Sequence, residues 1–287
     1  MKKLLTIGFL IIGMCVNAQV ATNNTTASGD VSTAMGYQAT ASGNTSTAMG
    51  SQTIANGVVS TAMGYKATAS GNTSTSMGSQ TTASGVVSTS MGYKTTASGN
   101  TSTSMGSQTT ASGDYSTAMG YRTTASGDHS VSIGLYNKSN TAGNGTAFVI
   151  GNGTADNVRS DAFKVMFNGD ATVSKDLIVN GELNTTSDAR LKMNIMSLGG
   201  TLAKLLLIDG KSYTTKKDGR QTIGVLAQDI QQVFPELVTT DDNDMLAVNY
   251  QGLVPVLINA LKEQDEKLQV QDERLARLEA IIADMNK

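Results

Sequence analysis

The 287-residue chain contains no tryptophan, only two prolines, one cysteine and one histidine, and aromatic residues make up 5% of it. So few large side chains do not favour a conventional hydrophobic core along the whole chain. The single Cys15 excludes an intramolecular disulfide, and with one histidine, His129, the usual zinc-ligand sets are out of reach. The same scarcity argues against a Ser-His-Asp triad. We therefore expect neither a metal nor a cofactor.

Charge is scarce as well. Charged residues make up 15% of the chain, and the formal net charge is −2. Such a chain presents no basic field that would attract nucleic acid or an anionic membrane surface. Neither is expected as a partner.

The amino end has the pattern of a targeting segment. Lys2 and Lys3 precede apolar residues from Leu4 to Val16, and positions 16–18 read Val-Asn-Ala. This pattern predicts a secretory signal peptide over residues 1–18, cleaved after Ala18. The apolar run of about 13 residues is shorter than the roughly 20 that span a bilayer. We expect a secreted or cell-surface protein without a transmembrane anchor in the mature chain, from which Cys15 has been removed.

The most regular feature is a repeat of 14 residues. From Ser32 the motif Ser-Thr-(Ala/Ser)-Met-Gly returns at this interval, and a second glycine lies half a period away. Tyrosine and serine alternate after the first glycine, which adds a 28-residue period. The first glycine series is Gly36, Gly50, Gly64, Gly78, Gly92, Gly106, Gly120 and Gly134, and the second is Gly43, Gly57, Gly71, Gly85, Gly99, Gly113 and Gly127.

A short fixed period indicates one supersecondary unit stacked on copies of itself. Fourteen residues are too few for a helical hairpin but suit two short strands and two tight turns, with glycine supplying positive φ. Alternation within the motif places Thr and Met on one face and Ser and Ala on the other. The predicted fold is mainly β, a parallel β-roll over residues 19–145. Because each coil buries little, we expect several chains to pack their Met faces together.

Residues 32–43, which read Ser-Thr-Ala-Met-Gly-Tyr-Gln-Ala-Thr-Ala-Ser-Gly, resemble the head repeat of trimeric autotransporter adhesins. The resemblance extends from Ala27 to Gly134. It implies a left-handed parallel β-roll in a homotrimer that binds host matrix, a glycan or another cell-surface ligand. The sequence departs from that family because no carboxy-terminal membrane barrel follows, so self-export in the family's manner is not expected.

Two other interpretations of the array stay open. One is a passive spacer, whose polar rows are solvated surface. The other is an ice-binding solenoid, because threonines recur at one position of every coil. That ladder comprises Thr47, Thr61, Thr75, Thr89, Thr103 and Thr117.

Short strands ended by Asn-Gly or Gly-Asp turns are predicted over residues 146–186. They include Thr146–Gly151, Ala162–Phe167 and Leu177–Val179. Phe148, Phe163 and Phe167 give this predicted β-rich neck a better core than the array has.

The sequence changes character at Ser187–Ile195, which reads Ser-Asp-Ala-Arg-Leu-Lys-Met-Asn-Ile. This stretch resembles the opening motif of the S74 peptidase family, the intramolecular chaperones of phage endosialidases and tail spikes. Two later stretches fit the family in order: residues 223–238, with Gly-Val-Leu-Ala-Gln and Phe-Pro-Glu, and residues 248–257, with Tyr-Gln-Gly-Leu-Val-Pro-Val-Leu. The resemblance implies a trimeric, α-rich chaperone that assembles the upstream β-fibre and then cuts itself free.

The residues are compatible with that chemistry. Serine needs a base to take its proton, and without a suitable histidine a lysine can serve, as in known Ser-Lys pairs. Carried over by position, Ser187 is the nucleophile and Lys192 the base; the family places the cut beside this serine. Attack of the Ser187 hydroxyl on the Thr186 carbonyl would break the Thr186–Ser187 bond. Asp188 would orient the pair or cap the following helix, and Gln228 would line the site or be structural.

Helical patterns follow. Residues 227–234 have helical spacing that Pro235 ends. A heptad then predicts a coiled coil over residues 253–287, after a chaperone domain over residues 187–252, with two glutamine layers that set the register. Its core positions are Val254, Leu257, Leu261, Gln264, Leu268, Gln271, Leu275, Leu278, Ile282 and Met285.

The sequence therefore predicts a secreted or cell-surface, homotrimeric, adhesin-like fibre. Its carboxy-terminal module would act as chaperone and as a single-turnover serine endopeptidase on its own chain, with no other catalytic activity. The main alternative is the same architecture without cleavage, in which the module stays as a permanent trimer base. A phage-type tail fibre is a further alternative, against which the signal peptide argues.

Overall fold

The computed structural model describes residues 23–138, 145–216, 218–241 and 244–286. The predicted signal peptide lies outside these residues. The chain divides into two compact units, Met1–Glu182 and Leu183–Lys287, and each is treated by itself.

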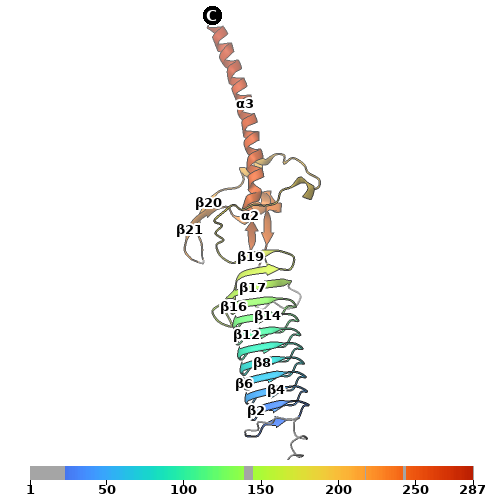
Figure 1. Cartoon of the computed structure of the whole chain (residues 1–287). Helices are drawn as coiled ribbons and strands as arrows, with labels where there is room; N and C mark the ends of the chain where they lie inside the picture. Colours follow the sequence, from blue (N-terminus) through green and yellow to red (C-terminus); the bar gives the residue numbers. More distant parts are fainter. Residues whose placement is uncertain (1–22, 139–144, 217, 242–243, 287) are drawn as a thin grey trace, which may run out of the picture. The chain divides into compact units, whose positions relative to one another are not determined.

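The first unit is a parallel β-solenoid in which two series of strands alternate along the chain (Figure 1). Each coil has one strand of five residues and one of two residues. The long strands are β2 (Thr33–Tyr37), β4 (Thr47–Ser51), β6 (Thr61–Tyr65), β8 (Thr75–Ser79), β10 (Thr89–Tyr93), β12 (Thr103–Ser107), β14 (Thr117–Tyr121) and β16 (Val131–Leu135). The short strands are β1 (Thr26–Ala27), β3 (Thr40–Ala41), β5 (Ile54–Ala55), β7 (Thr68–Ala69), β9 (Thr82–Ala83), β11 (Thr96–Ala97), β13 (Thr110–Ala111) and β15 (Thr124–Ala125).

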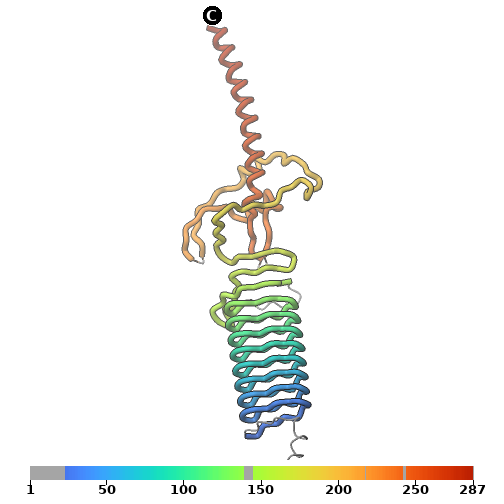
Figure 2. The backbone as a smooth tube through the Cα atoms, in the orientation of Figure 1, coloured from blue at the N-terminus to red at the C-terminus, as the bar shows by residue number. Residues whose placement is uncertain are grey.

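The sequence period sets the strand register. Thr33 pairs with Thr47 and Met35 with Met49, and the same 14-residue offset holds from coil to coil as far as β16. Equivalent residues therefore form columns that run along the solenoid, which Figure 2 shows as a stack of near-identical coils. The predicted parallel β-roll is confirmed.

The turns are built differently from the prediction. A non-glycine residue with φ between 42° and 60° stands at every seventh position from Val31 to Tyr136. Its amide bonds to the preceding coil; the Gln52 amide, for example, donates to the Tyr37 carbonyl at 2.7 Å. Each coil thus has two corners in the left-handed conformation, and these corner residues are not glycines.

The two glycine series are needed for other reasons. The first series has positive φ, +125° at Gly50, but lies at the end of the long strand rather than at the corner residue. A Cβ on Gly50 would lie 2.1 Å from the Gly64 carbonyl oxygen. In the second series a Cβ on Gly57 would lie 1.9 Å from the Gly71 carbonyl oxygen, without any positive φ. Glycine is therefore required there by the contact between coils, not by backbone conformation.

The coil interior is filled by small side chains. Alanines such as Ala34 and Ala48 are fully buried, together with serines and threonines, whereas Met35 and Thr33 lie half-buried on the outer face of the long strand. The predicted alternation holds, because Ser and Ala face the coil interior whereas Thr and Met face outward. Methionine is excluded because the space between the two strands of a coil is occupied by alanine-sized groups.

Hydroxyl pairs cross this interior in the middle coils. Ser76 and Thr81 lie 2.8 Å apart through their hydroxyl oxygens, and Ser90 is paired with Thr95 and Ser104 with Thr109 in the same way. Where alanine takes the serine position, opposite Thr53 and Thr123, the threonine hydroxyl is buried without a protein partner.

The short-strand sheet ends at an asparagine. Thr124 donates its amide to Asn137 Oδ1 at 2.7 Å, and Asn137 Nδ2 donates to the Thr124 carbonyl at 2.9 Å. In the preceding coil the Thr110 amide bonds to the Thr123 carbonyl instead. The fully buried side-chain amide of Asn137 therefore takes the place of the next coil's backbone.

The long-strand sheet continues into the region predicted as a neck. Strand β17 (Thr146–Asn152) pairs in parallel with β16, and β18 (Asp161–Met166) and β19 (Ala171–Val173) follow antiparallel. Phe148 contacts Phe163, with ring centroids 6.3 Å apart. Phe167 is exposed and does not join a core. The strand predicted over residues 177–179 is not formed, and these apolar residues are exposed because no strand lies beside them.

The second unit packs a small core around the start of a long helix. Its core residues are Ile230, Phe234 and Val256. Helix α2 ends before Pro235, as predicted, and the last helix covers the predicted heptad. Its elements are α1 (Thr201–Leu205), β20 (Lys211–Thr214), β21 (Gln221–Gly224), α2 (Ala227–Val233), β22 (Val238–Thr240), β23 (Leu246–Val248), α3 (Leu253–Met285) and three 3-10 turns, η1 (Ala189–Leu191), η2 (Pro235–Leu237) and η3 (Tyr250–Gly252).

The hydroxyl pairs predict different effects for two Thr→Ala substitutions at equivalent positions of different coils. Thr81→Ala removes the partner of Ser76, and we expect it to cost about 1–3 kcal/mol of unfolding free energy. Thr53→Ala removes a hydroxyl that has no partner, and we expect little loss or a gain, since Ala39 and Ala67 already occupy this position in other coils. Thermal and denaturant unfolding of the full chain measure the difference. Equal losses in both variants would contradict this explanation.

Candidate active site: the Ser187–Lys192 turn

Ser187 and Lys192 are brought together by one turn of 3-10 helix. The Lys192 ammonium nitrogen lies 2.7 Å from Ser187 Oγ and 3.1 Å from the Ser187 carbonyl oxygen, donating to both. Between them, η1 reverses the chain, and the Lys192 amide closes the turn on the Ala189 carbonyl. A serine hydroxyl and a lysine amine at this distance can exchange a proton once the amine is neutral.

Asp188 caps this turn rather than contacting the lysine. Its carboxylate accepts from the Arg190 amide at 2.8 Å and forms an ion pair with the Arg190 guanidinium. The hydrogen bonds from the Arg190 side chain and then from its backbone lower the pKa of Asp188 below its ordinary value. Of the two roles expected for Asp188, the capping role is the one its contacts support. Sequence reasoning gave no role to Arg190, although Asp-x-Arg at a turn allows this pairing.

Two hydrogen bonds among the described residues connect the chain on either side of this turn to helix α3 and the residues just before it. Thr185 Oγ1 donates to Gln251 Oε1 at 3.0 Å, and the Asn259 side-chain amide donates to the Leu198 carbonyl at 2.8 Å. Ser187 and Lys192 are both exposed to solvent in the single chain. The Ser187–Lys192 pair is therefore assembled locally, and among the described residues of the single chain nothing buries it.

The second and third sequence motifs meet at Gly224. A Cβ at this position would lie 2.9 Å from the Tyr250 hydroxyl and 3.1 Å from the Tyr213 hydroxyl, so the site accepts only glycine without rearrangement. The Val225 amide donates to the Tyr250 hydroxyl at 3.3 Å. Gln228 lies in a groove beside these tyrosines, lined also by Leu226, Met245 and Leu246. No hydrogen bond among the described residues links Gln228 to Ser187 or Lys192.

Helix α3 is fixed to the unit through Glu263, which the sequence analysis did not single out. Glu263 Oε1 accepts from the Thr201 amide at 2.6 Å and from the Thr201 hydroxyl at 2.8 Å, and Oε2 accepts from the Leu202 amide at 3.3 Å. These hydrogen bonds, chiefly from Thr201, lower the pKa of Glu263. The start of α1 and the first third of α3 are thereby joined.

Fold and site define a class of protein: a polar parallel β-solenoid joined to a small module that carries a serine–lysine pair and a long helix. Residues 27–53, 55–81, 83–109 and 111–137 match the YadA head domain repeat. Residues 187–239 match the chaperone of endosialidase, the peptidase S74 domain. The chain thus carries YadA head repeats followed by an S74 chaperone domain, as the resemblances implied. No curated protein matches the chain significantly.

These two domains together fit an adhesin or fibre of the trimeric autotransporter type, on the bacterial surface or outside the cell. Within the described residues, no helix combines the length and apolar character needed to cross a membrane.

The Glu263 contacts predict an acid-dependent stability. Because the folded pKa lies below the unfolded one, the ionised carboxylate stabilises the module above the ordinary value of 4.5, and this contribution is lost as pH falls through the folded pKa. We expect Glu263→Gln to lower module stability at pH 7, with its difference from wild type shrinking in acid. Circular dichroism at the helical wavelength follows the module, since all described helices lie in the second unit. Glu266→Gln, one turn along α3, is the control; equal effects of both variants would exclude the proposed role.

Proposed function

We propose that this protein is a secreted or cell-surface homotrimeric fibre whose carboxy-terminal module assembles the solenoids and then cuts itself off beside Ser187. The observation that carries the proposal is the 2.7 Å contact between the Ser187 hydroxyl and the Lys192 amine. This contact lies a few residues after the boundary between the two compact units, so a cut there would separate the solenoid from the module.

Helix α3 supports assembly because it has two different apolar faces. Val256 and Ala260 are buried against the module, and Glu263 continues this face. The heptad positions lie on another face, where Val254, Leu257 and most later core positions are exposed in the single chain. A continuous apolar seam with glutamine layers at positions 264 and 271 is suited to a coiled coil between copies. The proposed trimeric state is supported by the match to YadA head repeats rather than by the heptad.

The first unit supports association as well. The Thr and Met columns run along one outer face of the unit, where most of these side chains are half-buried. Packing three such faces together would bury the methionines that a single coil leaves outside. It would also cover the threonine ladder, which argues against the ice-binding alternative.

The start of the second unit points the same way. Met193 and Met196 are each more than 80% exposed, and Leu183, Leu191 and Ile195 are also largely exposed. Contiguous apolar side chains of this kind mark surfaces that are covered by a partner. Burial of this segment in the trimer would exclude water from the Ser187–Lys192 pair.

A template is needed because identical coils allow register errors. A shift of one chain by 14 residues preserves most local contacts, and pairing between separate chains requires closure entropy before any contact forms. A coiled coil would raise the effective concentration of the solenoids and set a common starting register.

The proposed cleavage is a shift of the Thr186 acyl group from nitrogen to oxygen. The neutral Lys192 amine takes the proton of the Ser187 hydroxyl while Oγ bonds to the Thr186 carbonyl carbon. The C–N bond then breaks, and the Ser187 nitrogen receives the proton. Water hydrolyses the resulting ester, which leaves a carboxylate on Thr186 and restores the hydroxyl of the new amino-terminal Ser187.

We predict that Ser187→Ala and Lys192→Ala each leave the chain uncut, whereas wild type yields two fragments that meet beside residue 187. Intact-mass measurement of the purified protein detects both outcomes. Lys204→Ala removes a lysine of the same unit that makes no contact with Ser187 and is the control. An uncut wild-type trimer would favour the non-cleaving fibre.

We further predict that Leu268→Lys combined with Leu275→Lys prevents assembly, since it places charges in the proposed seam. Light scattering with size-exclusion chromatography should then show no trimer, and cleavage should fall with it. Glu266→Lys combined with Glu273→Lys alters charge on the outer side of the same heptads and should leave the trimer intact. A trimer that persists in the leucine variant would overturn the coiled-coil proposal.

A further inference from the structure

The solenoid carries six charged side chains between residues 23 and 137, and they are separated by sign. The three cations stand at the corner residues that directly follow Tyr65, Tyr93 and Tyr121. The three carboxylates stand beside the other corner, seven residues away along the chain. The cations are Lys66, Lys94 and Arg122, and the carboxylates are Asp30, Asp114 and Asp128.

Each cation is combined with an aromatic ring. The Lys66 amine lies 5.2 Å from the centre of the Tyr65 ring, and the Lys94 amine has the same distance to Tyr93. Both rings are nearly half exposed, at 44% and 45%. Among the described residues neither lysine has a carboxylate within ion-pair distance. The intervening coils carry serine and glutamine at these two positions, as at Ser79 and Gln80.

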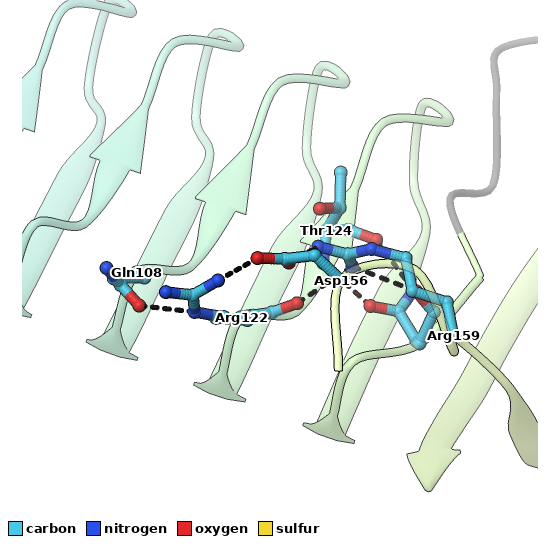
Figure 3. A network of polar contacts seen from close by, with 6 residues as sticks. Gln108, Arg122, Thr124, Asp156 and Arg159 are labelled. Atoms are coloured by element: carbon cyan, nitrogen blue, oxygen red, sulfur yellow. Dashed lines mark hydrogen bonds and ion pairs between the residues drawn. The ribbon is translucent and has the colours of Figure 1, made fainter. Parts of the chain in front are cut away.

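The three tyrosine–cation pairs form one column along the solenoid, here called the Tyr–cation column. At its third cation, Arg122, a carboxylate of the chain itself is already bound. Arg122 forms an ion pair with Asp156, and its Nε donates to Gln108 Oε1 at 2.5 Å (Figure 3). Arg159 holds Asp156 from the other side at 2.8 Å. The corner of this coil therefore binds a carboxylate beside tyrosine rings, with a glutamine from the coil before it taking part. The Lys66 and Lys94 corners share the tyrosine, the cation and the glutamine of the coil before, and have no counterpart of Asp156 or Arg159.

The spacing limits the ligand. Two coils measure about 9.6 Å, so successive cations are separated by about that length. One disaccharide of an extended, β-linked polysaccharide has a similar length. A nucleic acid strand carries a charge about every 3.4 Å, far more often than this column offers a cation. Tyrosine offers a sugar ring an apolar face, and glutamine and serine offer its hydroxyl groups hydrogen bonds.

We infer that the Tyr–cation column binds a linear acidic polysaccharide with one carboxylate per disaccharide, lying along the solenoid. Tyr65 and Tyr93 stack on alternate sugars while Lys66 and Lys94 pair with the carboxylates. In a symmetric parallel trimer the same coil of each chain lies at the same height. The coils that carry Lys66 and Lys94 have no carboxylate beside their other corner, so none from a neighbouring chain lies level with these lysines. The inference rests on the proposed adhesive fibre and names its ligand.

The test measures binding of hyaluronan, which has one carboxylate per disaccharide, to the full-length protein at low and physiological salt. We expect carboxyl-reduced hyaluronan to bind at least about tenfold more weakly, and hyaluronan binding to weaken as salt rises. We expect affinity to rise from one disaccharide to two, as the second lysine is reached.

The repeats supply matched variants. Lys66→Gln with Lys94→Gln, and Tyr65→Ser with Tyr93→Ser, install the residues of the intervening coils, and each pair should reduce hyaluronan binding at least about tenfold. The control is Val58→Asn with Val86→Asn. It installs the asparagine that the intervening coils carry beside the other corner, as at Asn72 and Asn100, and should leave hyaluronan binding unchanged. Four results would each overturn the inference. They are hyaluronan binding that the lysine substitutions leave unaffected, equal binding of the carboxyl-reduced polymer, no hyaluronan binding at low salt, and tighter binding of oligothymidylate through the same lysines. Trimer mass and cleavage measured on the same samples report separately on the proposed function.

Discussion

The contact between successive coils is the constraint on which the rest of the molecule depends. At two points in each coil the backbone passes so close to the next coil that a Cβ would lie about 2 Å from a carbonyl oxygen. Such contact is possible only if every coil has the same length and the same glycines, which fixes the 14-residue period and places equivalent residues in columns. The space between the two strands of each coil is also narrow and holds alanine, serine and threonine.

That interior explains why the solenoid needs help. Burial of alanine-sized groups removes little apolar surface per residue, whereas each ordered residue still costs about 1–2 kcal/mol of backbone entropy. The methionines, which are the larger apolar groups, lie on the outer face. Further burial of apolar surface must therefore come from contacts outside the coil, and the exposed seam of α3 and the exposed segment around residues 177–196 have the same requirement. The methionine face of the solenoid, the seam of α3 and the exposed segment are thus all explained by one proposed association between chains.

Sequence alone predicted the features that follow from periodicity. The 14-residue repeat gave the strand register, and the heptad gave the extent of α3, since both are regular geometry. It failed where a residue's role depends on what faces it. The second glycines are required by a carbonyl of the next coil, and Asn137 replaces a backbone strand, which no local pattern specifies. The sequence places Ser187 and Lys192 five residues apart, but the role of Glu263 depends on Thr201, 62 residues earlier in the chain.

The reactive pair illustrates the difference between local and assembled structure. Six consecutive residues, held by the Asp188 cap, bring the hydroxyl and the amine together without help from the rest of the module. Their exposure means that the pair's surroundings, unlike its geometry, depend on what covers the segment. A low-dielectric environment is what makes a lysine available as a base, because it disfavours the charged ammonium. If association provides that environment, chemistry begins only after the chains have met, and the cut then leaves a fibre whose coils are already closed against one another and held by their unfolding barrier.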